Sequence, residues 1–397
     1  MTQSFDIDSV KFVKDFYPRF EFDNETVNSY RLAIDDLPPI IVTQEGFLVD
    51  GYHRFVAHKL EGRKEIAVEI VDIPQDRILW EATKRNADHG KQLSMKEKRF
   101  LARQFYENNG VTQVEIKGVL SVSESTLSNW LSDLVREAKE QQKQQIIDLY
   151  LQCSTYEEIC TKLSVSKSTI SELVQKLKNE FLYYAPDSLQ LFNVWYFPNR
   201  DKQYGLDFKG AIPGQIVENV LYYFTEPFDV VVDPMAGGGT TIDVCKALKR
   251  RYRAYDINPM REDIAKHDIT QGFPKECNNC DLIFLDPPYF NMVFDTFKDV
   301  NRFYGFVEKL VKDCFSTVKP GGIVALLMQD MTEKGNYCLS GECYRIFRQV
   351  GFETIAHISC PLTTQQWIGR DINWAKENKI MLGRNRDLYV FRRSKNG

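Results

Sequence analysis

Three apolar runs in the second half of the chain each lead into an aspartate, and this pattern constrains the fold more than any other feature. The runs are VVVDPM (230–235), YRAYDIN (252–258) and DLIFLDPPY (281–289). They are short and apolar enough to be buried strands. Helix-like stretches such as TIDVCKALKRR (241–251) and FVEKLVKDCFSTV (306–318) lie between and after them. This alternation predicts a doubly wound α/β sheet over residues 185–397, with ligands bound at the carboxyl ends of parallel strands.

A glycine-rich turn follows the first of these runs, in DPMAGGGTT (233–241). Glycines allow a tight turn and close backbone approach, but the spacing is neither GxGxxG nor a Walker loop. Asp256, at the end of the next run, is placed to accept hydrogen bonds from ribose hydroxyls. Asp268 is placed to accept from an adenine amino group. One such acid alone is more often a cap or a surface charge, whereas three at successive strand ends favour a nucleotide-like cofactor.

The DPPY stretch ends the third run with an acceptor-only array. The two prolines fix φ and supply no N–H, so the carboxylate of Asp286 and the carbonyl of Pro287 are held rigidly. Such an array suits an exocyclic NH2 group, whose nitrogen becomes nucleophilic when its lone pair is aimed at an electrophile. Tyr289 offers an aromatic face for a planar ring. A base inside a duplex must be flipped out to reach this site.

DPMAGGGTT and DPPY together resemble the S-adenosylmethionine-dependent amino-methyltransferases of DNA, over residues 193–391. The resemblance implies a Rossmann-like domain, S-adenosylmethionine as cofactor, and adenine N6 as the favoured target. It also implies that NVWYFPNRDKQYG (193–205) closes over the methionine end of the cofactor. The implied catalytic residues are Asp286, Pro287, Pro288 and Tyr289. The implied cofactor-binding residues are Asp233, Pro234, Ala236, Gly237, Gly239, Thr240, Asp256 and Asp268.

Residues 91–180 are polar and helical and contain an internal repeat. Residues 111–134 and 154–177 align without gaps, with 11 of 24 positions identical. Each copy predicts a helix, the turn S-V-S, and a second helix capped by a serine, which is the pattern of a helix-turn-helix. Polar residues open each second helix where base edges would be read, and two helical hairpins that merely pack together remain the alternative. The candidate DNA-binding residues are Ser125, Thr126, Ser168 and Thr169.

Residues 1–90 mix short strands and turns and predict an α+β domain. VDGYHRFVAHKLEG (49–62) resembles the phosphate-binding segment of the ParB/sulfiredoxin fold. The resemblance places Gly51, His53 and Arg54 at a helix N-terminus, where backbone N–H groups and a guanidinium attract phosphate. The Gly-Glu-Arg-Arg of CTP-hydrolysing ParB proteins stands here as Gly-Tyr-His-Arg. A nucleotide or the DNA backbone are both candidate ligands, and a purely structural helix start is the alternative.

Composition sets the remaining limits. A net charge of −4 and a pI near 5.9 restrict any nucleic-acid surface to a local patch. No segment has the features of a signal peptide or a membrane span, which predicts a cytoplasmic protein of bacterial, phage or mobile-element type. The CNNC pair at 277–280 lacks a second pair at zinc-site spacing, so we expect no metal.

These observations predict a three-part DNA methyltransferase, with residues 1–90 and 91–180 locating double-stranded DNA and residues 185–397 modifying adenine N6. Three alternatives stay open: a cytosine-N4 DNA enzyme, an RNA amino-methyltransferase, and a non-enzymatic ParB-like regulator that retains an inactive methyltransferase fold. A homodimer is compatible with both N-terminal parts.

Overall fold

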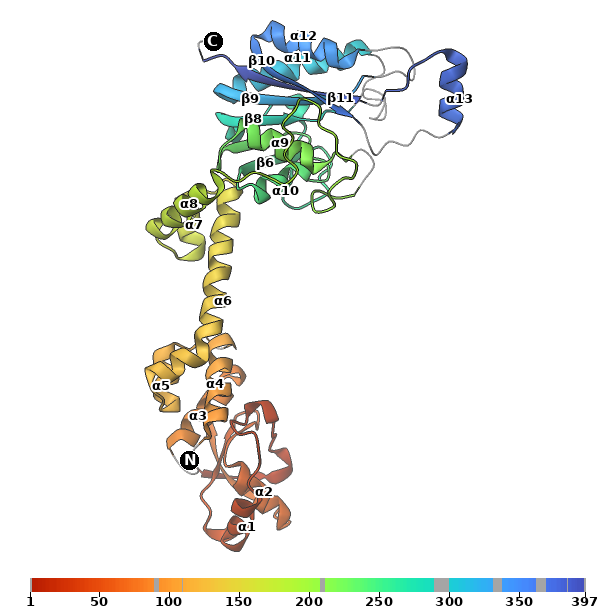
Figure 1. Cartoon of the computed structure of the whole chain (residues 1–397). Helices are drawn as coiled ribbons and strands as arrows, with labels where there is room; N and C mark the ends of the chain where they lie inside the picture. The colour runs from red at the N-terminus through yellow and green to blue at the C-terminus, as the bar shows by residue number, and fades with distance from the viewer. Residues whose placement is uncertain are drawn as a thin grey trace. The chain divides into compact units, whose positions relative to one another are not determined.

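The computed structural model describes residues 2–88, 93–108, 110–207, 211–288, 300–330, 338–361, 369–383 and 385–395. The chain divides into two compact units, residues 1–141 and 142–397 (Figure 1). The boundary falls inside helix α6 (Glu124–Leu151). The division into parts at residues 90 and 180 therefore stays a prediction.

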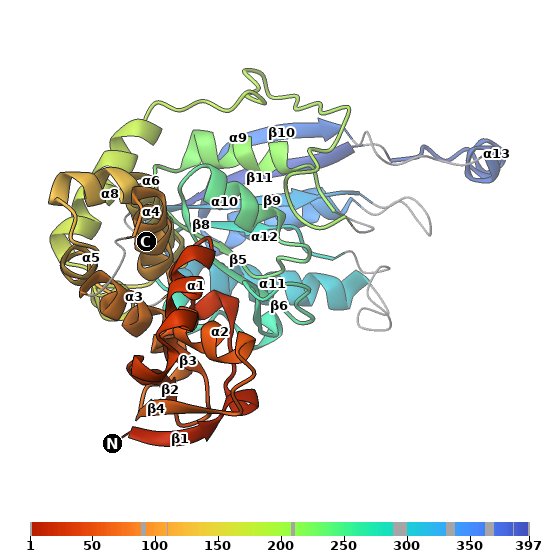
Figure 2. The same cartoon turned by 90° about the horizontal axis from the view of Figure 1, so that it is seen from below.

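The first unit opens with a four-stranded sheet of order β1-β4-β2-β3, beside α1 and α2 (Figure 2). β2 pairs antiparallel with β3 and parallel with β4, and the strand, turn, strand, helix, strand order predicted for residues 40–71 is confirmed. The elements of this part are β1 (Thr2–Asp6), α1 (Asn24–Leu32), β2 (Ile40–Thr43), β3 (Leu48–Asp50), α2 (Tyr52–Leu60), β4 (Glu65–Val71) and α3 (Ile78–Asp88).

The internal repeat forms two helical hairpins with matching caps. The hairpins are α5 (Gln113–Leu120) with α6, which follow α4 (Met95–Asn108), and α7 (Tyr156–Leu163) with α8 (Lys167–Phe181). A threonine and a glutamate form a capping box at the start of each first helix, Thr112 with Glu115 and Thr155 with Glu158. The hydroxyls of Ser123 and Ser166 accept the N–H of Thr126 and Thr169. The predicted serine caps are therefore confirmed, and each contact recurs at the 43-residue offset of the repeat.

The end of α6, which leads into the second hairpin, packs on the sheet domain of the second unit. Leu151 at the end of α6 is buried in the main core of that unit. The guanidinium of Arg251 lies 4.8 Å from the Tyr150 ring centre and donates to the Tyr150 carbonyl. Cys153 contacts the carbonyl of Tyr252 through its thiol. These contacts join α6 to the strand that begins at Arg251.

The described part of the second unit contains a seven-stranded sheet of order β10-β11-β9-β8-β5-β6-β7. β9, β8, β5, β6 and β7 are parallel to their neighbours in that run, as predicted. The strands are β5 (Val230–Asp233), β6 (Arg251–Asp256), β7 (Ala265–Lys266), β8 (Cys280–Leu285), β9 (Val318–Met328), β10 (Phe352–Pro361) and β11 (Asn385–Arg393).

The last strand departs from the purely parallel sheet that the sequence predicts. β11 lies between β9 and β10 and runs antiparallel to both. Because the chain returns to the sheet from the edge at which β10 ends, β11 must run in the opposite direction. Its first residues consequently lie at the carboxyl edge of the parallel strands, since Asp387 pairs with Met328, the last residue of β9.

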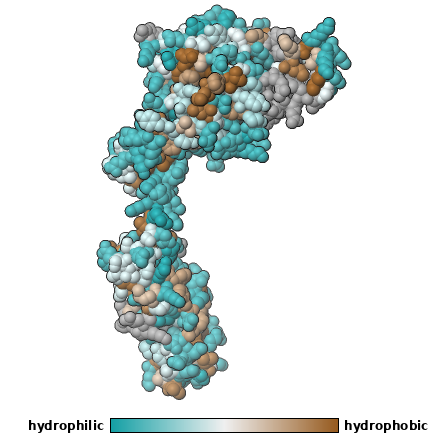
Figure 3. Space-filling model, viewed as in Figure 1, coloured by the Kyte–Doolittle hydropathy of each residue, from teal (hydrophilic) through white to brown (hydrophobic). Residues whose placement is uncertain are grey.

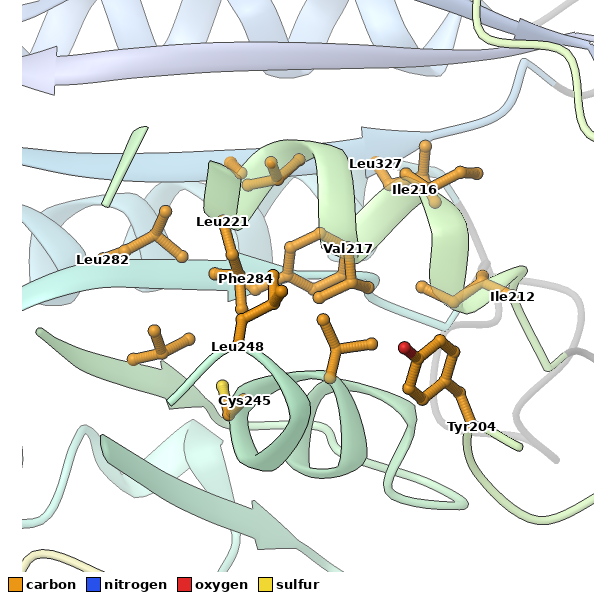
Figure 4. Close-up of a cluster of buried hydrophobic side chains, with 14 of the residues drawn as sticks. Tyr204, Ile212, Ile216, Val217, Leu221, Cys245, Leu248, Leu282, Phe284 and Leu327 are labelled. Atoms are coloured by element: carbon orange, nitrogen blue, oxygen red, sulfur yellow. The ribbon is translucent and has the colours of Figure 1, made fainter. Parts of the chain in front are cut away.

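Helices cover both faces of this sheet and bury two cores. α9 (Gly214–Phe224) and α10 (Thr240–Ala247) cover one face, and α11 (Val300–Thr317) and α12 (Leu339–Val350) cover the other. Figure 4 shows Phe284, Leu282 and Leu327 from the sheet packed against Val217 and Leu221 of α9. Ile283 and Leu285 of β8 belong to the opposite core. This alternation fixes which face each strand-end side chain reaches.

Exposed apolar side chains gather on the second unit along residues 191–196. Leu191, Phe192, Val194 and Tyr196 are 77%, 82%, 49% and 56% exposed, and Figure 3 shows brown apolar surface on this unit. Backbone hydrogen bonds join Asn193 and Trp195 to Ser359 of β10, so this segment extends the sheet edge. A further helix, α13 (Gly369–Asn378), precedes β11. No helix in the described parts of the chain is long and apolar enough to span a membrane.

Candidate functional site

The carboxyl edge of the sheet has a topological switch point between β5 and β8. From β5 the chain continues to β6 on one side, and from β8 it continues to β9 on the other. Connections that diverge in this way leave a crevice in which α/β folds bind ligands. Asp233 ends β5 and Asp286 directly follows β8, so the two predicted aspartates flank this point. Leu282 and Phe284 precede Asp286 at intervals of two in the core under α9, which places Asp286 on that face.

The glycine-rich turn is anchored to β6 by backbone hydrogen bonds. The Gly237 N–H donates to Asp256 Oδ2 over 2.9 Å, and the Ala236 N–H donates to the Tyr255 carbonyl over 2.9 Å. Gly237 and Gly239 have φ of +51° and +82°, in the left-handed region that glycine tolerates. Gly239 is the N-cap of α10 and provides no side-chain cap. The first N–H groups of α10, which begins at Thr240, therefore face the crevice end without a capping side chain.

Arg261 holds this turn from outside, and the sequence analysis did not identify it. Its guanidinium donates twice to Asp243 of α10, at 2.7 Å each, and twice to Asp263. A Cβ at Gly239 would meet Arg261 Nη1 at 2.5 Å. No local sequence pattern links residues 239, 243 and 261, so the contact of Arg261 with Asp243 and Gly239 is seen only in the folded chain.

The segment before α9 also packs over the glycine turn. The Leu206 N–H donates to the Gly238 carbonyl over 2.9 Å, and the Gly205 N–H donates to Asp243 Oδ2 over 2.8 Å. Arg200 donates to the carbonyls of Tyr204, Gly205 and Leu206 and so fixes the shape of the segment. The part of NVWYFPNRDKQYG that lies next to the turn is thus its C-terminal end.

Burial raises the pKa of both aspartates at the switch point. The pKa of Asp233 rises to about 7, mainly by desolvation and further by the negative charges of Asp286 and Asp256. Its Oδ1 accepts the Met235 N–H over 3.0 Å. Desolvation also raises the pKa of Asp286, and the nearby positive charge of Arg386 opposes that rise. Pro287 is buried and Pro288 half-buried, whereas Tyr289 lies outside the described residues.

The side chains of Asp256 and Asp268 each accept two hydrogen bonds from the chain but distribute them differently over their two oxygens. Asp256 accepts the N–H of Gly237 and of Asn258, one on each oxygen. Each of these oxygens retains a lone pair for a further donor. A single oxygen of Asp268, Oδ1, accepts both the N–H and the hydroxyl of Thr270, and these bonds lower its pKa.

The donor set at the crevice fits S-adenosylmethionine. Uncapped N–H groups at the start of α10 and close backbone approach at Gly237 and Gly239 suit a polar cofactor end. The Asp256 carboxylate suits ribose hydroxyls. Pro234, in the turn after β5, and Thr240, at the start of α10, lie in the same loop. The described residues contain no group of three His, Cys, Asp or Glu side chains that could hold a metal.

The first unit has a separate cavity of about 960 Å³ beside the start of α2. Gly51, with φ of +97°, is the N-cap of α2, and Arg54 and His53 line the cavity. Arg54 donates to Asp50 over 2.9 Å, and His53 Nε2 accepts the Asp23 N–H over 3.2 Å. Aromatic side chains of this unit also line it: Phe12, Tyr17, Phe22 and Tyr52. The structure thus brings the three predicted phosphate-site residues together at one cavity.

The predicted DNA-contacting hydroxyls lie in the first turn of the second helix of each hairpin, α6 and α8. Ser125 and Thr126 share hydrogen bonds with Ser123 at 2.9 and 2.8 Å. Ser168 and Thr169 repeat this arrangement around Ser166, at 2.7 and 2.9 Å. These contacts are all exposed, and each hydroxyl retains capacity for a further partner.

Comparisons with known proteins point to one family. A family model described as DNA methylase, of the N6/N4 type, matches residues 24–267. A type II methyltransferase, M.BglII from Bacillus subtilis, is 36% identical over 89 residues, which is 22% of this chain and 24% of that protein. This chain therefore spans about a quarter of the length of the curated relative that it matches.

Two solved structures show weaker likeness. TrmN from Thermus thermophilus has a TM-score of 0.31 at 16% identity, covering 47% of this chain and 50% of that chain. The C-terminally truncated chromosome-partitioning protein ParB from Caulobacter crescentus, complexed to the centromeric parS site, has a TM-score of 0.27 at 18% identity. That match covers 44% of this chain and 99% of that chain. Both TM-scores are too low to assign a shared fold to the whole chain.

Changing Gly239 to alanine should strain the backbone of the turn and bring the new Cβ too close to the guanidinium of Arg261. We expect G239A to lower the free energy of unfolding by about 1–3 kcal/mol, because alanine at positive φ is strained, and to weaken cofactor binding. Urea unfolding and calorimetric titration with S-adenosylmethionine would measure the two effects. G305A is the control, since a Cβ there meets nothing within 4 Å in α11. If G239A and G305A had the same free energy of unfolding and the same cofactor affinity, the proposed close approach of the backbone at Gly239 would be contradicted.

Asp233 should make the cofactor-free chain less stable as pH rises. A carboxyl whose pKa is about 7 in the fold and lower when unfolded binds its proton more tightly in the fold. Its contribution therefore falls as pH rises from about 4 to about 7, by up to about 4 kcal/mol in all. D233N removes this dependence, so we expect its stability advantage over the wild type to grow from pH 5 to pH 8 in urea unfolding. A pH-independent difference would contradict the assignment.

Proposed function

The chain belongs to the N6/N4 DNA methylase family, and on that premise we propose that it methylates the N6 amino group of a flipped adenine in duplex DNA. S-adenosylmethionine is the cofactor, since the family consists of methyltransferases. The observation that carries the proposal is the pair of aspartates at the switch point, the buried Asp233 beside the glycine turn and the half-buried Asp286 that opens DPPY. Adenine is favoured over cytosine N4 by the resemblance of DPPY to adenine enzymes.

The roles of the residues follow from this arrangement. The cofactor supplies a methyl group on a sulfonium, which is an electrophile that needs no activation by an acid. Asp286 and the Pro287 carbonyl accept hydrogen bonds from the exocyclic NH2 and orient its lone pair toward the methyl carbon. As the N–C bond would form, the sulfur–methyl bond would break and leave its electron pair on the sulfur, which becomes the neutral thioether; positive charge would develop on the nitrogen, where the Asp286 carboxylate would stabilise it. The proton that the nitrogen then releases has the same carboxylate as its nearest acceptor.

The cofactor contacts stay within one loop and one strand end. The N–H groups of the turn at 236–240 would hold a polar end of the cofactor, and the Asp256 carboxylate would accept from its ribose hydroxyls. Arg261 and the segment at 200–206 hold the turn in its shape through hydrogen bonds to Asp243. Tyr289 is the proposed stacking partner of the flipped base. Asp268 remains a candidate acceptor for the adenine end of the cofactor.

Residues 1–180 are proposed to select the DNA. The two hairpins present matching hydroxyl turns, and the end of α6, which leads into the second hairpin, packs on the sheet through Tyr150 and Leu151. A duplex held at Ser168 and Thr169 would therefore be held by the same compact unit that carries Asp286. The first hairpin and the ParB-like domain would add contacts along the same duplex.

Asp286 should be required for methyl transfer but not for cofactor binding. We expect D286A to reduce transfer of labelled methyl groups to duplex DNA at least about 100-fold, since it removes a preorganised acceptor, with an unchanged cofactor dissociation constant. D387N is the control, because Asp387 lies at the same sheet edge on the opposite face, bonded to His357. Modified-base mapping in DNA from expressing cells identifies the base and the site. Full activity of D286A would refute the catalytic role, and methylation of tRNA instead of DNA would favour the RNA alternative.

A second binding function is supported by the cavity at Gly51. We propose that it takes the phosphates of a nucleotide, held by Arg54 and the N–H groups at the start of α2. We expect R54Q to weaken binding of CTP, ATP or inorganic triphosphate at least about tenfold in calorimetric titration. R63Q is the control, since Arg63 forms an exposed ion pair with Asp35. Binding that is absent in the wild type, or equal in both variants, would leave Arg54 as a structural residue only.

A further inference from the structure

Arg386 lies at the catalytic edge of the sheet although it comes near the end of the chain. On β11, Leu388 and Val390 belong to the core under α9 and α10, so Arg386, two residues before Leu388, lies on that face. It directly precedes Asp387, which pairs with the last residue of β9. Asp286 lies on the same face at the end of β8, and β9 alone separates β8 from β11. Two strand spacings, roughly 10 Å, therefore separate the backbones, a gap that an arginine side chain can largely bridge.

The guanidinium of Arg386 forms no hydrogen bond or ion pair shorter than 4 Å within the described part of the chain. Its Nε is buried without a hydrogen-bond acceptor, and no described carboxylate forms an ion pair with it. Arg261, by contrast, is held by two carboxylates. The residues flanking Arg386 are also paired, Asp387 with His357 and Asn385 with Ser359. Arg386 is half-buried, and leaving its buried Nε–H without an acceptor costs free energy, so an acceptor from a ligand would be bound there favourably.

The position of Arg386 in the sheet indicates which anionic group of a ligand could reach its guanidinium. The cofactor turn follows β5, and β8 and β9 lie between β5 and β11, so Arg386 is about three strand spacings, roughly 14 Å, from the turn. It lies on the far side of Asp286 from the cofactor. A base whose amino group faces Asp286 must extend its sugar and phosphates away from the cofactor side. Guanidinium groups bind phosphate through paired N–H donors and are more weakly hydrated than ammonium groups.

We propose that Arg386 binds a phosphate of the target strand next to the flipped nucleotide. The inference rests on the proposed function, because it presupposes DNA at Asp286. The contact would hold the extruded backbone while DPPY holds the base. The same positive charge acts on Asp286 and favours the ionised, acceptor form of that carboxylate.

The test compares R386Q and R386K with the wild-type full-length chain in methyl transfer to plasmid DNA. We expect R386Q to lower kcat/KM for DNA about 10- to 100-fold. The slope of log kcat/KM against log salt concentration should become shallower by about 1, because one phosphate contact is lost. R386K should keep the steeper slope, since lysine retains the charge. R392Q is the control, as Arg392 is exposed at the other end of the same strand.

Three outcomes would overturn the proposal. An unchanged salt slope in R386Q, even with lower activity, would make Arg386 structural. If R386Q instead raised the dissociation constant of S-adenosylmethionine and left kcat/KM for DNA and its salt dependence unchanged, the guanidinium would bind the cofactor carboxylate. An effect of equal size in R392Q would mean a general loss of positive charge. If the wild-type chain transfers no methyl group to DNA, the proposed function fails separately, and the salt dependence of DNA binding by the same variants still tests the phosphate contact.

Discussion

The second unit depends on how its sheet ends, because buried strands deliver carboxylates to a common edge. Asp233 and Asp286 stand at the ends of neighbouring strands, Asp233 buried and Asp286 half-buried, and the negative charge of Asp286 disfavours ionisation of Asp233. Such an arrangement is tolerated only where N–H donors or a cation are supplied, and the Met235 N–H and the positive charge of Arg386 supply them. The same electrostatic tension that costs stability in the free protein attracts positively charged or hydrogen-donating ligands. Stability and ligand affinity are thus opposed at one pair of residues.

The sequence predicts well those features that local chemistry controls. Apolar runs gave the strands at 230–233 and 280–285, and serine and threonine patterns gave the helix starts of both hairpins. Glycines marked the turn that has positive φ in the fold. In these cases the signal and the structure lie within a few residues of each other, so propensity and periodicity suffice.

Features that depend on chain reversal or on distant partners could not be predicted in this way. The direction of β11 follows from where β10 ends, and an apolar run reads the same in either direction. Arg261 contacts Asp243 across 18 residues with no periodicity to connect them. Arg386 appears in the sequence as one basic residue near the end of the chain, and the sheet register alone places it on the face of Asp286. The sequence therefore predicts the motifs at this edge of the sheet, but not that Arg261 and Arg386 lie beside them.

The matched caps of the two hairpins carry an evolutionary consequence. The capping residues Thr112, Glu115 and Ser123 of the first copy have identical counterparts 43 residues later, whereas many exposed positions between them differ. A duplicated segment that preserves only its folding signals leaves each copy free to change its outer surface. Ser125 and Ser168 can thus acquire different neighbours, and so different sequence preferences, without either helix losing its start. Divergence of target sites between relatives would then require few substitutions and no change in the catalytic domain.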